Sequence, residues 1–324
     1  MNRTIKLSYK ASLLGAVALS GVGFATGALA AGKTIAVAVA DQKSLFYVAA
    51  VAGMKDEAAK QGVELRIVSA DNNSGQQIKQ VQDLLVQNPG ALIFISQDST
   101  AAAAGVKAAN QANVPVIAVD EKPESGQGKL ATYIATDSVK AARELCSWQF
   151  DQIGKKGNIA ILHGVSGATA EAQRTQGCQE ALKNYPDIKV VAEQTANWDE
   201  TEAFKATQNI LTANPDLKAV FGESDAMAIG AAKAAKKAGR NGLVFTGIDG
   251  FPTMFTAIRQ GLVQGSKAQS PYGMGVLAVQ NAVDIMNGKT VPEVQLRDAT
   301  LITKDNVDKE DVTKYYGPTA KDMQ

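Results

Sequence analysis

Acidic and aromatic residues stand directly after several short apolar runs of this sequence. Asp120 ends the run "VPVIAV" and Asp249 ends "LVFTGI", whereas Trp198 follows "KVVAE". Phe46 and Tyr47 stand shortly after "TIAVAVA", where a helical pattern begins. Carboxylates offer paired acceptor oxygens that suit neighbouring hydroxyl groups, and flat rings cover apolar C–H faces. This combination of side chains predicts a binding site for a neutral, polyhydroxylated ligand.

The sequence offers little that could catalyse a reaction. It holds one histidine, His163, so a site with several imidazoles is excluded and a Ser-His-Asp triad has a single candidate base. The stretch "LHGVSGATA" lacks the last glycine of G-x-S-x-G, and no phosphate loop or dinucleotide loop of the usual glycine spacing occurs. We therefore expect a binding protein that is not an enzyme, with no cofactor and no metal, in which His163 has a structural role.

Short β-branched runs alternate with helical patterns along the whole chain, and this alternation predicts parallel sheets built from βαβ units. In "SGQQIKQVQDLLVQNPG", for example, Ile78, Val81 and Leu85 recur at helical spacing, and the "NPG" that follows ends the helix. The predicted strands are residues 34–40, 64–70, 91–95, 114–119, 158–162, 189–193, 219–221 and 243–248.

These strands fall into two groups of about four, separated by the passage "EKPESGQGK" and the short run 131–135. Two more irregular passages, "GIDGFPT" and "AQSPYG", follow the second group. We predict an α/β fold of two doubly wound parallel-sheet lobes, joined by three chain crossings that act as a hinge. Because ligands bind beyond the carboxyl ends of parallel strands, both lobes would present strand-end loops to one cleft. The predicted boundaries are 1–30 for a signal peptide, 31–136 with 270–298 for the N-terminal lobe, and 137–269 with 299–324 for the C-terminal lobe and tail.

The first thirty residues predict a cleavable export signal. Arg3, Lys6 and Lys10 are basic, residues 11–24 are small and apolar, and "ALA" at 28–30 is a cleavage site. Removing this segment takes the balance of basic against acidic residues from 33 against 32 to 30 against 32. A nearly neutral chain has no bulk electrostatic attraction to nucleic acid or to an anionic membrane. We expect a protein that is exported to a bacterial periplasm and binds no nucleic acid.

The two cysteines, Cys146 and Cys178, both lie in the predicted C-terminal lobe. In an oxidising compartment they could form a disulfide, but two small thiols would also pack well in a core. The spacing leaves both alternatives open. A disulfide would cross-link two segments of one lobe and would not join the two lobes.

Six blocks of the sequence, in one order, carry a family resemblance: "TIAVAVADQKSLFYVAAVAGMKDEA", "VPVIAVDEKP", "GATAEAQRTQGC", "LTANPDLKAVFGESDAMAIGA", "GIDGFP" and "AQSPYGMG". With them the chain resembles the ribose-binding-protein group of periplasmic solute-binding proteins over essentially its whole mature length. The resemblance implies two lobes that close on a sugar and present the closed form to the permease of an ABC transporter. In some members of the group the closed form also contacts a chemoreceptor. We expect a monomer.

The resemblance also implies roles for individual residues. It places a carboxylate in each lobe, aromatic rings on both faces of the ligand, an arginine on a helix of the second lobe, an amide beside the hinge, and serines at two positions that the group fills with asparagine. Glu121 stands where ribose binders carry arginine. The implied ligand-binding residues are Ser44, Phe46, Tyr47, Asp120, Glu121, Arg174, Trp198, Ser224, Asp249 and Gln269.

Departures from the ribose-binding pattern indicate a different ligand. Glu121 provides hydrogen-bond acceptors where ribose binders have the paired donors of an arginine. Ser44 and Ser224 replace amide side chains. Asp41 and Lys43 add charge to the first loop. We therefore expect a sugar alcohol, another pentose or hexose, or a ligand whose amino group pairs with Glu121, in place of ribose.

Each candidate also has a structural interpretation. Phe46 and Tyr47 could face the core from the first turn of a helix, and Trp198 could pack on the helix that begins near Asp199. Turn, cap or solvated-charge roles are open for Lys43, Asp120, Glu121, Arg174, Ser224, Asp225 and Asp249. The functional interpretation is favoured because the candidates converge on strand ends of two facing lobes.

Three other functions share features with this sequence. A regulator of the lactose-repressor type has the same core but needs a DNA-binding helix-turn-helix, and an export signal occupies that place here. A receptor for a small signalling molecule or chemotaxis attractant would have the same site. A secreted carbohydrate-active enzyme would need two suitably spaced carboxylic acids, which Asp120 and Asp249 could supply.

Overall fold

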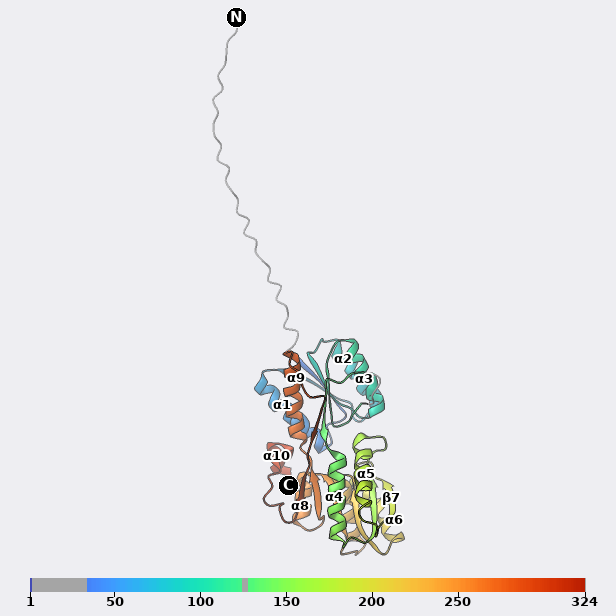
Figure 1. Ribbon diagram of the computed structural model, residues 1–324. Coiled ribbons are helices and arrows are strands. Elements are labelled where there is room, and N and C mark those ends of the chain that lie inside the picture. Colours follow the sequence, from blue (N-terminus) through green and yellow to red (C-terminus); the bar gives the residue numbers. More distant parts are fainter. Residues whose placement is uncertain (2–33, 124–127, 324) are drawn as a thin grey trace. The chain divides into compact units, whose positions relative to one another are not determined.

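The computed structural model describes residues 1, 34–123 and 128–323 of the chain (Figure 1). The predicted signal peptide at 1–30 lies outside these ranges, apart from Met1. Within them, helices alternate with strands, and the strands form two sheets of six strands each. The prediction of an α/β fold with two doubly wound sheets is confirmed.

The first sheet is parallel throughout, in the order β11-β5-β4-β3-β1-β2. Ile35 and Val37 of β1 pack with α1 and α9, whereas Ala36 and Ala38 pack with α2 and α3. Because alternate side chains of a strand point to opposite faces, a strand covered on both faces is apolar throughout. The elements of this lobe are β1 (Thr34–Val39), α1 (Leu45–Gln61), β2 (Glu64–Ser69), α2 (Ser74–Leu85), β3 (Ala91–Ile95), α3 (Ser99–Gln111), β4 (Val116–Val119), β5 (Thr132–Thr136), α9 (Pro271–Met286) and β11 (Val294–Arg297).

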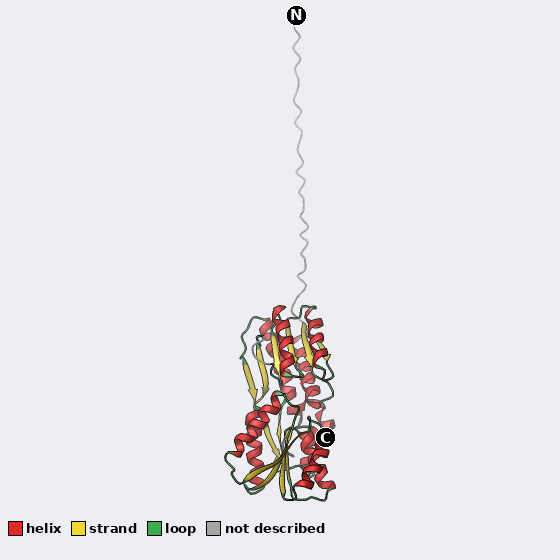
Figure 2. Cartoon of the chain, turned by 90° about the vertical axis from the view of Figure 1, so that its right-hand side faces the viewer, coloured by secondary structure: helices red, strands yellow, loops and turns green. Residues whose placement is uncertain are grey.

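The second sheet has the order β12-β10-β9-β8-β6-β7, in which β12 pairs antiparallel with β10 and the other pairs are parallel. Ile159 and Ile161 of β6 pack with α4 and α5, whereas Ala160 and Leu162 pack with α6 and α7, so helices again cover both faces (Figure 2). The elements of this lobe are α4 (Ser138–Gln152), β6 (Gly157–His163), α5 (Thr169–Leu182), β7 (Ile188–Thr195), α6 (Glu200–Ala213), β8 (Leu217–Gly222), α7 (Asp225–Lys237), β9 (Val244–Asp249), α8 (Pro252–Arg259), β10 (Gly265–Ala268), β12 (Thr300–Thr303), α10 (Thr313–Tyr316) and the short helix η1 (Pro318–Met323).

The chain passes between the two sheets three times, after β5, after β10 and between β11 and β12. At these crossings the Thr136 hydroxyl donates to Gln269 Oε1 at 2.7 Å, and Lys140 Nζ lies 2.7 Å from Asp298 Oδ1. Two of the irregular passages are not themselves crossings. "EKPESGQGK" precedes β5 of the first sheet, and "GIDGFPT" joins β9 to α8 within the second lobe. Irregular composition marks strand-end loops as readily as changes of sheet.

All eight predicted strands are present, with ends shifted by at most two residues. The short run at 131–135 corresponds to β5. The strands β11 and β12 were not predicted. Each has four residues at a sheet edge, and Val294 and Leu296 of β11 are exposed, so neither strand shows the apolar pattern of a buried strand.

Helices α4 and α5 pack closely side by side. A Cβ atom on Gly177 of α5 would overlap the main-chain oxygen of Val139, so the contact requires glycine. Cys146 of α4 and Cys178 of α5 form a disulfide, with 5.5 Å between their Cα atoms. Of the two alternatives for the cysteines, the structure has the bonded one, and the bond lies within the second lobe.

Candidate functional site

A cavity of about 620 Å³ lies among the loops that follow the carboxyl ends of strands in both sheets. The structure brings all ten sequence-predicted site residues to its wall. They come from the loops after β1, β4, β7, β8 and β10, from the last residue of β9, and from helices α1 and α5. The predicted residues on the wall are Ser44, Phe46, Tyr47, Asp120, Glu121, Arg174, Trp198, Ser224, Asp249 and Gln269.

The first-lobe rings stand at the start of α1. Asp41 Oδ1 accepts hydrogen bonds from the main-chain nitrogens of Lys43 and Ser44 at 2.6 and 2.8 Å, and this turn fixes the loop that leads into the helix. The Phe46 and Tyr47 rings meet edge to face, with centroids 5.6 Å apart. Phe46 is buried in the core of the first lobe and Tyr47 is half-buried. Both rings therefore pack against the core and also line the cavity.

Trp198 supplies a ring from the second lobe, in the loop between β7 and α6. Its backbone has φ of +63°, in the left-handed region. The guanidinium carbon of Arg174 lies 5.3 Å from its ring centroid. A Cβ atom on Gly164 would overlap the same ring, so only glycine fits behind it. These contacts hold the indole in one place on the cavity wall.

Arg174 of α5 is the buried cation of the site, with 4% exposure. One terminal nitrogen donates to the main-chain oxygen of Glu223, and the other lies 3.7 Å from Asp249 Oδ1. Its Nε is buried and has no hydrogen-bond partner among the described residues. Because an unsatisfied buried donor costs free energy, an acceptor on a bound molecule would stabilise this arrangement.

Asp249 ends β9 and has partners on two sides. Its Oδ1 accepts from Gln269 Nε2 at 2.8 Å, and its Oδ2 accepts from the main-chain nitrogen of Asp225 at 3.3 Å. Burial raises the pKa of Asp249 to about 6, although Arg174 opposes the shift. Gln269 also accepts the hydrogen bond from Thr136 at the hinge, so one amide connects the Asp249 carboxylate with a crossing strand.

Asp225 has a structural role, as the cap-or-turn interpretation predicts. Its Oδ2 accepts from the main-chain nitrogens of Gly250 and Phe251 at 2.6 and 2.9 Å, and its Oδ1 accepts from Ser266 Oγ at 2.7 Å. Burial, followed by the charge of Asp249, raises the pKa of Asp225 to about 8. The residue fixes the loop after β9 and does not line the cavity.

Asp120 offers the first-lobe carboxylate. It follows β4 with φ of +67°, and its main-chain oxygen accepts a hydrogen bond from the Tyr133 hydroxyl at 2.8 Å. No described residue donates a hydrogen bond to its carboxylate. Burial raises its pKa to about 6, again opposed by Arg174. The carboxylate therefore lies at the cavity wall, where its oxygens can accept hydrogen bonds from a ligand.

Glu121 has a partner within the protein. Both carboxylate oxygens accept from the main-chain nitrogen of Thr169 at 2.9 and 3.0 Å, and Oε1 accepts from the Thr169 hydroxyl at 2.6 Å. The N-cap residue of α5 is Ala168, which has no side-chain cap bond, so Glu121 caps this helix from the other lobe. Burial raises the pKa of Glu121 to about 7, opposed by the hydrogen bonds from Thr169.

The two serines differ. Ser224 Oγ accepts from the main-chain nitrogen of Met227 at 3.3 Å, so this residue is the N-cap of α7, as its structural interpretation predicts. Ser44 occupies the N-cap position of α1 without a side-chain cap bond. The hydroxyl of Ser44 therefore has more freedom to serve a ligand than that of Ser224.

Among the wall residues that were missed from the sequence, four carry amide or aromatic side chains. Asn72 follows β2, Gln97 follows β3, Asn197 follows β7 and Phe251 follows β9. The rule that found Asp120 and Asp249 would have found them as well, because each stands just beyond the carboxyl end of a parallel strand. They add amide groups to both lobes and a further ring to the second.

Residues 35–290 match the periplasmic binding protein domain family. The chain belongs to this family. The ribose import binding protein of Bacillus subtilis (strain 168) is 36% identical over 260 residues, which cover 80% of this chain and 83% of that protein. The xylitol-binding protein of Mycolicibacterium smegmatis (strain ATCC 700084 / mc(2)155) is 34% identical over 310 residues, which cover 92% of this chain and 87% of that protein.

The fold agrees with solved periplasmic binding proteins. The crystal structure of an ABC transporter periplasmic solute binding protein from Actinobacillus succinogenes 130z with bound D-allose is similar, with a TM-score of 0.82 and 29% identity, and the match covers 86% of this chain and 99% of that one. The family consists of binding proteins rather than enzymes, so the prediction of a protein without catalytic activity is confirmed. It also implies a periplasmic location. No helix in the described ranges is long and apolar enough to cross a membrane.

Proposed function

We propose that this periplasmic binding protein is the substrate-binding component of an ABC importer and that it binds one neutral monosaccharide or sugar alcohol in the cavity between its lobes. The observation that carries the proposal is the composition of the cavity wall. Rings from both lobes stand beside an Asp120 carboxylate and an Arg174 Nε that have no described hydrogen-bond partner. Relatives named for ribose and xylitol, and a similar structure with bound D-allose, support the same ligand class.

Binding would stabilise the closed form because both lobes contribute contacts. A ligand placed between Trp198 on one side and Phe46 and Tyr47 on the other is covered on both apolar faces only when the lobes are together. Only contacts that are better made in the closed form shift the equilibrium toward it. The predicted lobe boundaries, 31–136 with 270–298 and 137–269 with 299–324, define the two bodies that would move about the crossings.

The hydroxyl-rich class is favoured over a ligand with an amino group. The expected partner for an amino group was Glu121, and its oxygens already accept from Thr169. Asp120 and Asp249 then supply the acceptors for ligand hydroxyl groups, and Arg174 supplies the donor. We propose binding roles for all ten predicted residues except Glu121 and Ser224, which act through the structure of the closed cleft.

The partner of the closed form is the importer's permease. We also propose that the protein acts as a monomer after removal of a signal peptide at residues 1–30. Sensing is the alternative function, in which the same closed surface is recognised by a chemoreceptor for a sugar attractant or another small signal.

A thermal-shift panel tests the proposed ligand class. Pentoses, hexoses, linear polyols and inositols are compared with sugar phosphates at the same concentration. We expect at least one neutral polyol or sugar other than ribose to raise the melting temperature and the phosphates to have no effect, because the wall carries several carboxylates and one buried arginine. Strong stabilisation by ribose alone, or by sugar phosphates, would overturn the proposed ligand class.

A further inference from the structure

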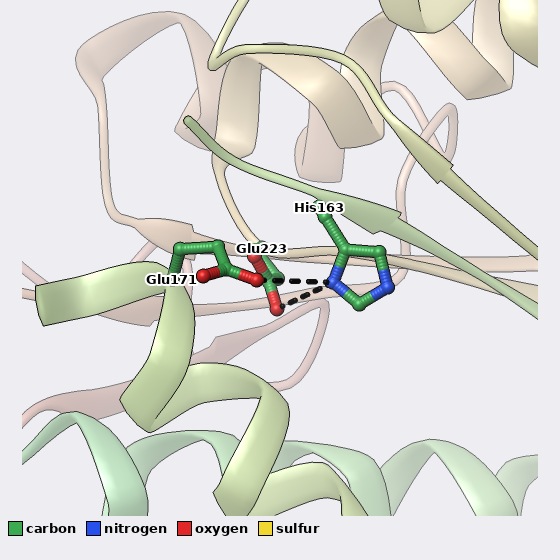
Figure 3. A group of neighbouring side chains, drawn as sticks. All are labelled: His163, Glu171 and Glu223. Carbon is green, nitrogen blue, oxygen red and sulfur yellow. Dashed lines mark hydrogen bonds and ion pairs between the residues drawn. The ribbon is translucent and has the colours of Figure 1, made fainter. Parts of the chain in front are cut away.

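Three side chains with metal-binding atoms converge at the carboxyl end of β6, outside the wall of the cavity (Figure 3). His163 is the last residue of β6, Glu223 follows β8, and Glu171 lies in the first turn of α5. One atom of each lies within 4.8 Å of the other two. Figure 3 shows both carboxylates on the Nδ1 side of the imidazole ring. We propose that these three residues form a binding site for one divalent transition-metal ion of the zinc type.

The spacing of the donors fits four-coordinate zinc. His163 Nδ1 lies 3.2 Å from Glu223 Oε1 and 3.7 Å from Glu171 Oε1. With zinc–ligand bonds of about 2.0–2.1 Å, tetrahedral geometry puts neighbouring ligand atoms about 3.3 Å apart. The two measured separations lie on either side of that value, so small side-chain movements would complete the site. The Thr175 hydroxyl lies among these donors, 3.1 Å from Nδ1, and donates to Glu223 Oε1 at 2.7 Å. Metal binding would require this hydroxyl to turn away from Glu223, and water would be the fourth ligand.

The groups around the donors are also arranged as in a metal site. Glu193 Oε2 lies 2.8 Å from His163 Nε2, and the main-chain nitrogen of Gly164 donates to Glu223 Oε2 at 2.8 Å. A carboxylate that accepts from one ring nitrogen keeps the proton there and turns the lone pair of the other nitrogen toward the metal. The contact from Gly164 leaves Oε1 of Glu223 directed at His163.

The charge of the cluster favours a cation. Glu171, Glu193 and Glu223 surround one imidazole, and Glu223 is fully buried. In the described part of the chain, no lysine or arginine forms an ion pair with these three carboxylates. Even with a doubly protonated imidazole, the group has an excess of negative charge. Three carboxylates and an imidazolium sum to −2, and a divalent ion in place of the Nδ1 proton would reduce this charge to −1. The carboxylates of Glu171 and Glu223 would then be ligands rather than close like charges.

The expectation of no metal rested on the single histidine, which excludes a site with several imidazoles. One imidazole with two carboxylates is a different donor set. Glu223 lies 60 positions after His163, and the three residues form no local motif, so only the fold brings them together. The inference does not depend on the proposed sugar-binding function.

Calorimetric titration of the chelator-treated full chain with zinc chloride at neutral pH tests the site. We expect one zinc ion per chain. Glu171→Gln should weaken binding at least ~10-fold because it removes a ligand, and Glu193→Gln by about 10–100-fold because it releases the ring orientation. The matched control is Glu180→Gln, the same change on the same helix away from the cluster, which should bind zinc as the wild type does. Glu171 and Glu193 are partly exposed, so these variants keep the buried Glu223 intact.

Two further readouts separate a site from surface binding. Cobalt as the probe should give the intense visible bands of a tetrahedral ion in the wild type and in Glu180→Gln, but not in Glu171→Gln. Zinc should raise the melting temperature and calcium should not, because calcium requires six to eight oxygen ligands. Absence of saturable zinc binding, unchanged binding by Glu171→Gln, or equal losses in Glu171→Gln and Glu180→Gln would overturn the proposal.

Discussion

The Glu121 carboxylate of the first lobe accepts hydrogen bonds from the main-chain nitrogen and the hydroxyl of Thr169, the first residue of α5 in the second lobe. The helix has no cap from its own lobe, because its N-cap residue is Ala168. In an open form, both the helix end and the carboxylate would be exposed to water. Glu121 therefore favours closure in the absence of ligand and is a positioning residue for the binding site.

Glu121→Ala should shift the ligand-free protein toward open forms. A helix cap contributes about 0.5–2 kcal/mol, so the closure equilibrium should change roughly 2–30-fold and ligand affinity should weaken by the same factor. Double electron–electron resonance between spin labels on Lys79→Cys of α2 and Lys205→Cys of α6 measures the distribution. The native cysteines are bonded to each other and buried, so only the introduced thiols take a label.

Two further variants complete this test. Thr169→Val keeps the main-chain donor and loses the hydroxyl. Its distance distribution should therefore lie between that of the wild type and that of Glu121→Ala. Glu64→Ala removes an exposed carboxylate of the same lobe and should leave the distances unchanged. If the distance distribution of Glu121→Ala matches that of the wild type, Glu121 does not favour closure of the ligand-free protein.

Affinity for a neutral polyhydroxylated ligand should rise as pH rises through about 6. In the ligand-free closed form, burial raises the pKa of Asp120 and of Asp249 to about 6, in each case opposed by Arg174. Ligand hydroxyls that donate to the ionised carboxylates favour the charged form and lower these pKa values in the complex. Binding then releases protons. The affinity is therefore highest above pH 6 and decreases as pH falls below this value.

Calorimetry between pH 5 and pH 8 checks this dependence. Asp249→Asn should bind more weakly with a flatter pH profile. Glu121 changes the affinity in the opposite direction as pH falls, because closure buries this carboxylate and raises its pKa to about 7. The pH dependence is therefore measured in a Glu121→Gln background. Affinity that increases on acidification in that background would show that ionised carboxylates do not accept from the ligand.

The disulfide should contribute to stability and not to affinity. Cys146 and Cys178 are 32 residues apart and join α4 to α5 within one lobe. A loop of that length gives about 3–4 kcal/mol in the chain-entropy description. The double variant Cys146→Ala/Cys178→Ala should melt at a lower temperature and bind ligand with unchanged affinity at 25 °C. A weakened affinity in the folded variant would mean that the bond also positions Arg174 on α5.

Much of the fold could be predicted from the sequence because each buried parallel strand is a short apolar run bounded by polar loops. The edge strands β11 and β12 gave no such signal, since residues such as Val294 and Leu296 are exposed and the pairing depends on distant partners. Irregular composition alone does not identify the crossings, for a related reason. A loop such as "GIDGFPT" has the same composition whether the next strand joins the same sheet or the other one.

The position of the site could be predicted as well, but not the partners of its side chains. Strand-end placement brought Asp120, Asp249 and Trp198 to one cavity. Nothing in the sequence shows that Glu121 would cap α5 across the cleft, because Thr169 is 48 positions away. In the same way, the hydrogen bonds that commit Asp225 and Ser224 to the loop after β9 and to α7 are properties of the folded chain.

Calorimetric titration of Trp198→Ala, with the sugar or polyol that stabilises the wild type, tests directly whether the ligand lies between rings of the two lobes. Trp148→Ala is the matched control, because the other tryptophan lies on α4, away from the cavity wall. We expect Trp198→Ala to lose at least ~2 kcal/mol of binding free energy because the ligand loses its ring coverage, and Trp148→Ala to bind as the wild type does. Unchanged affinity in Trp198→Ala would contradict a ligand held between rings of the two lobes.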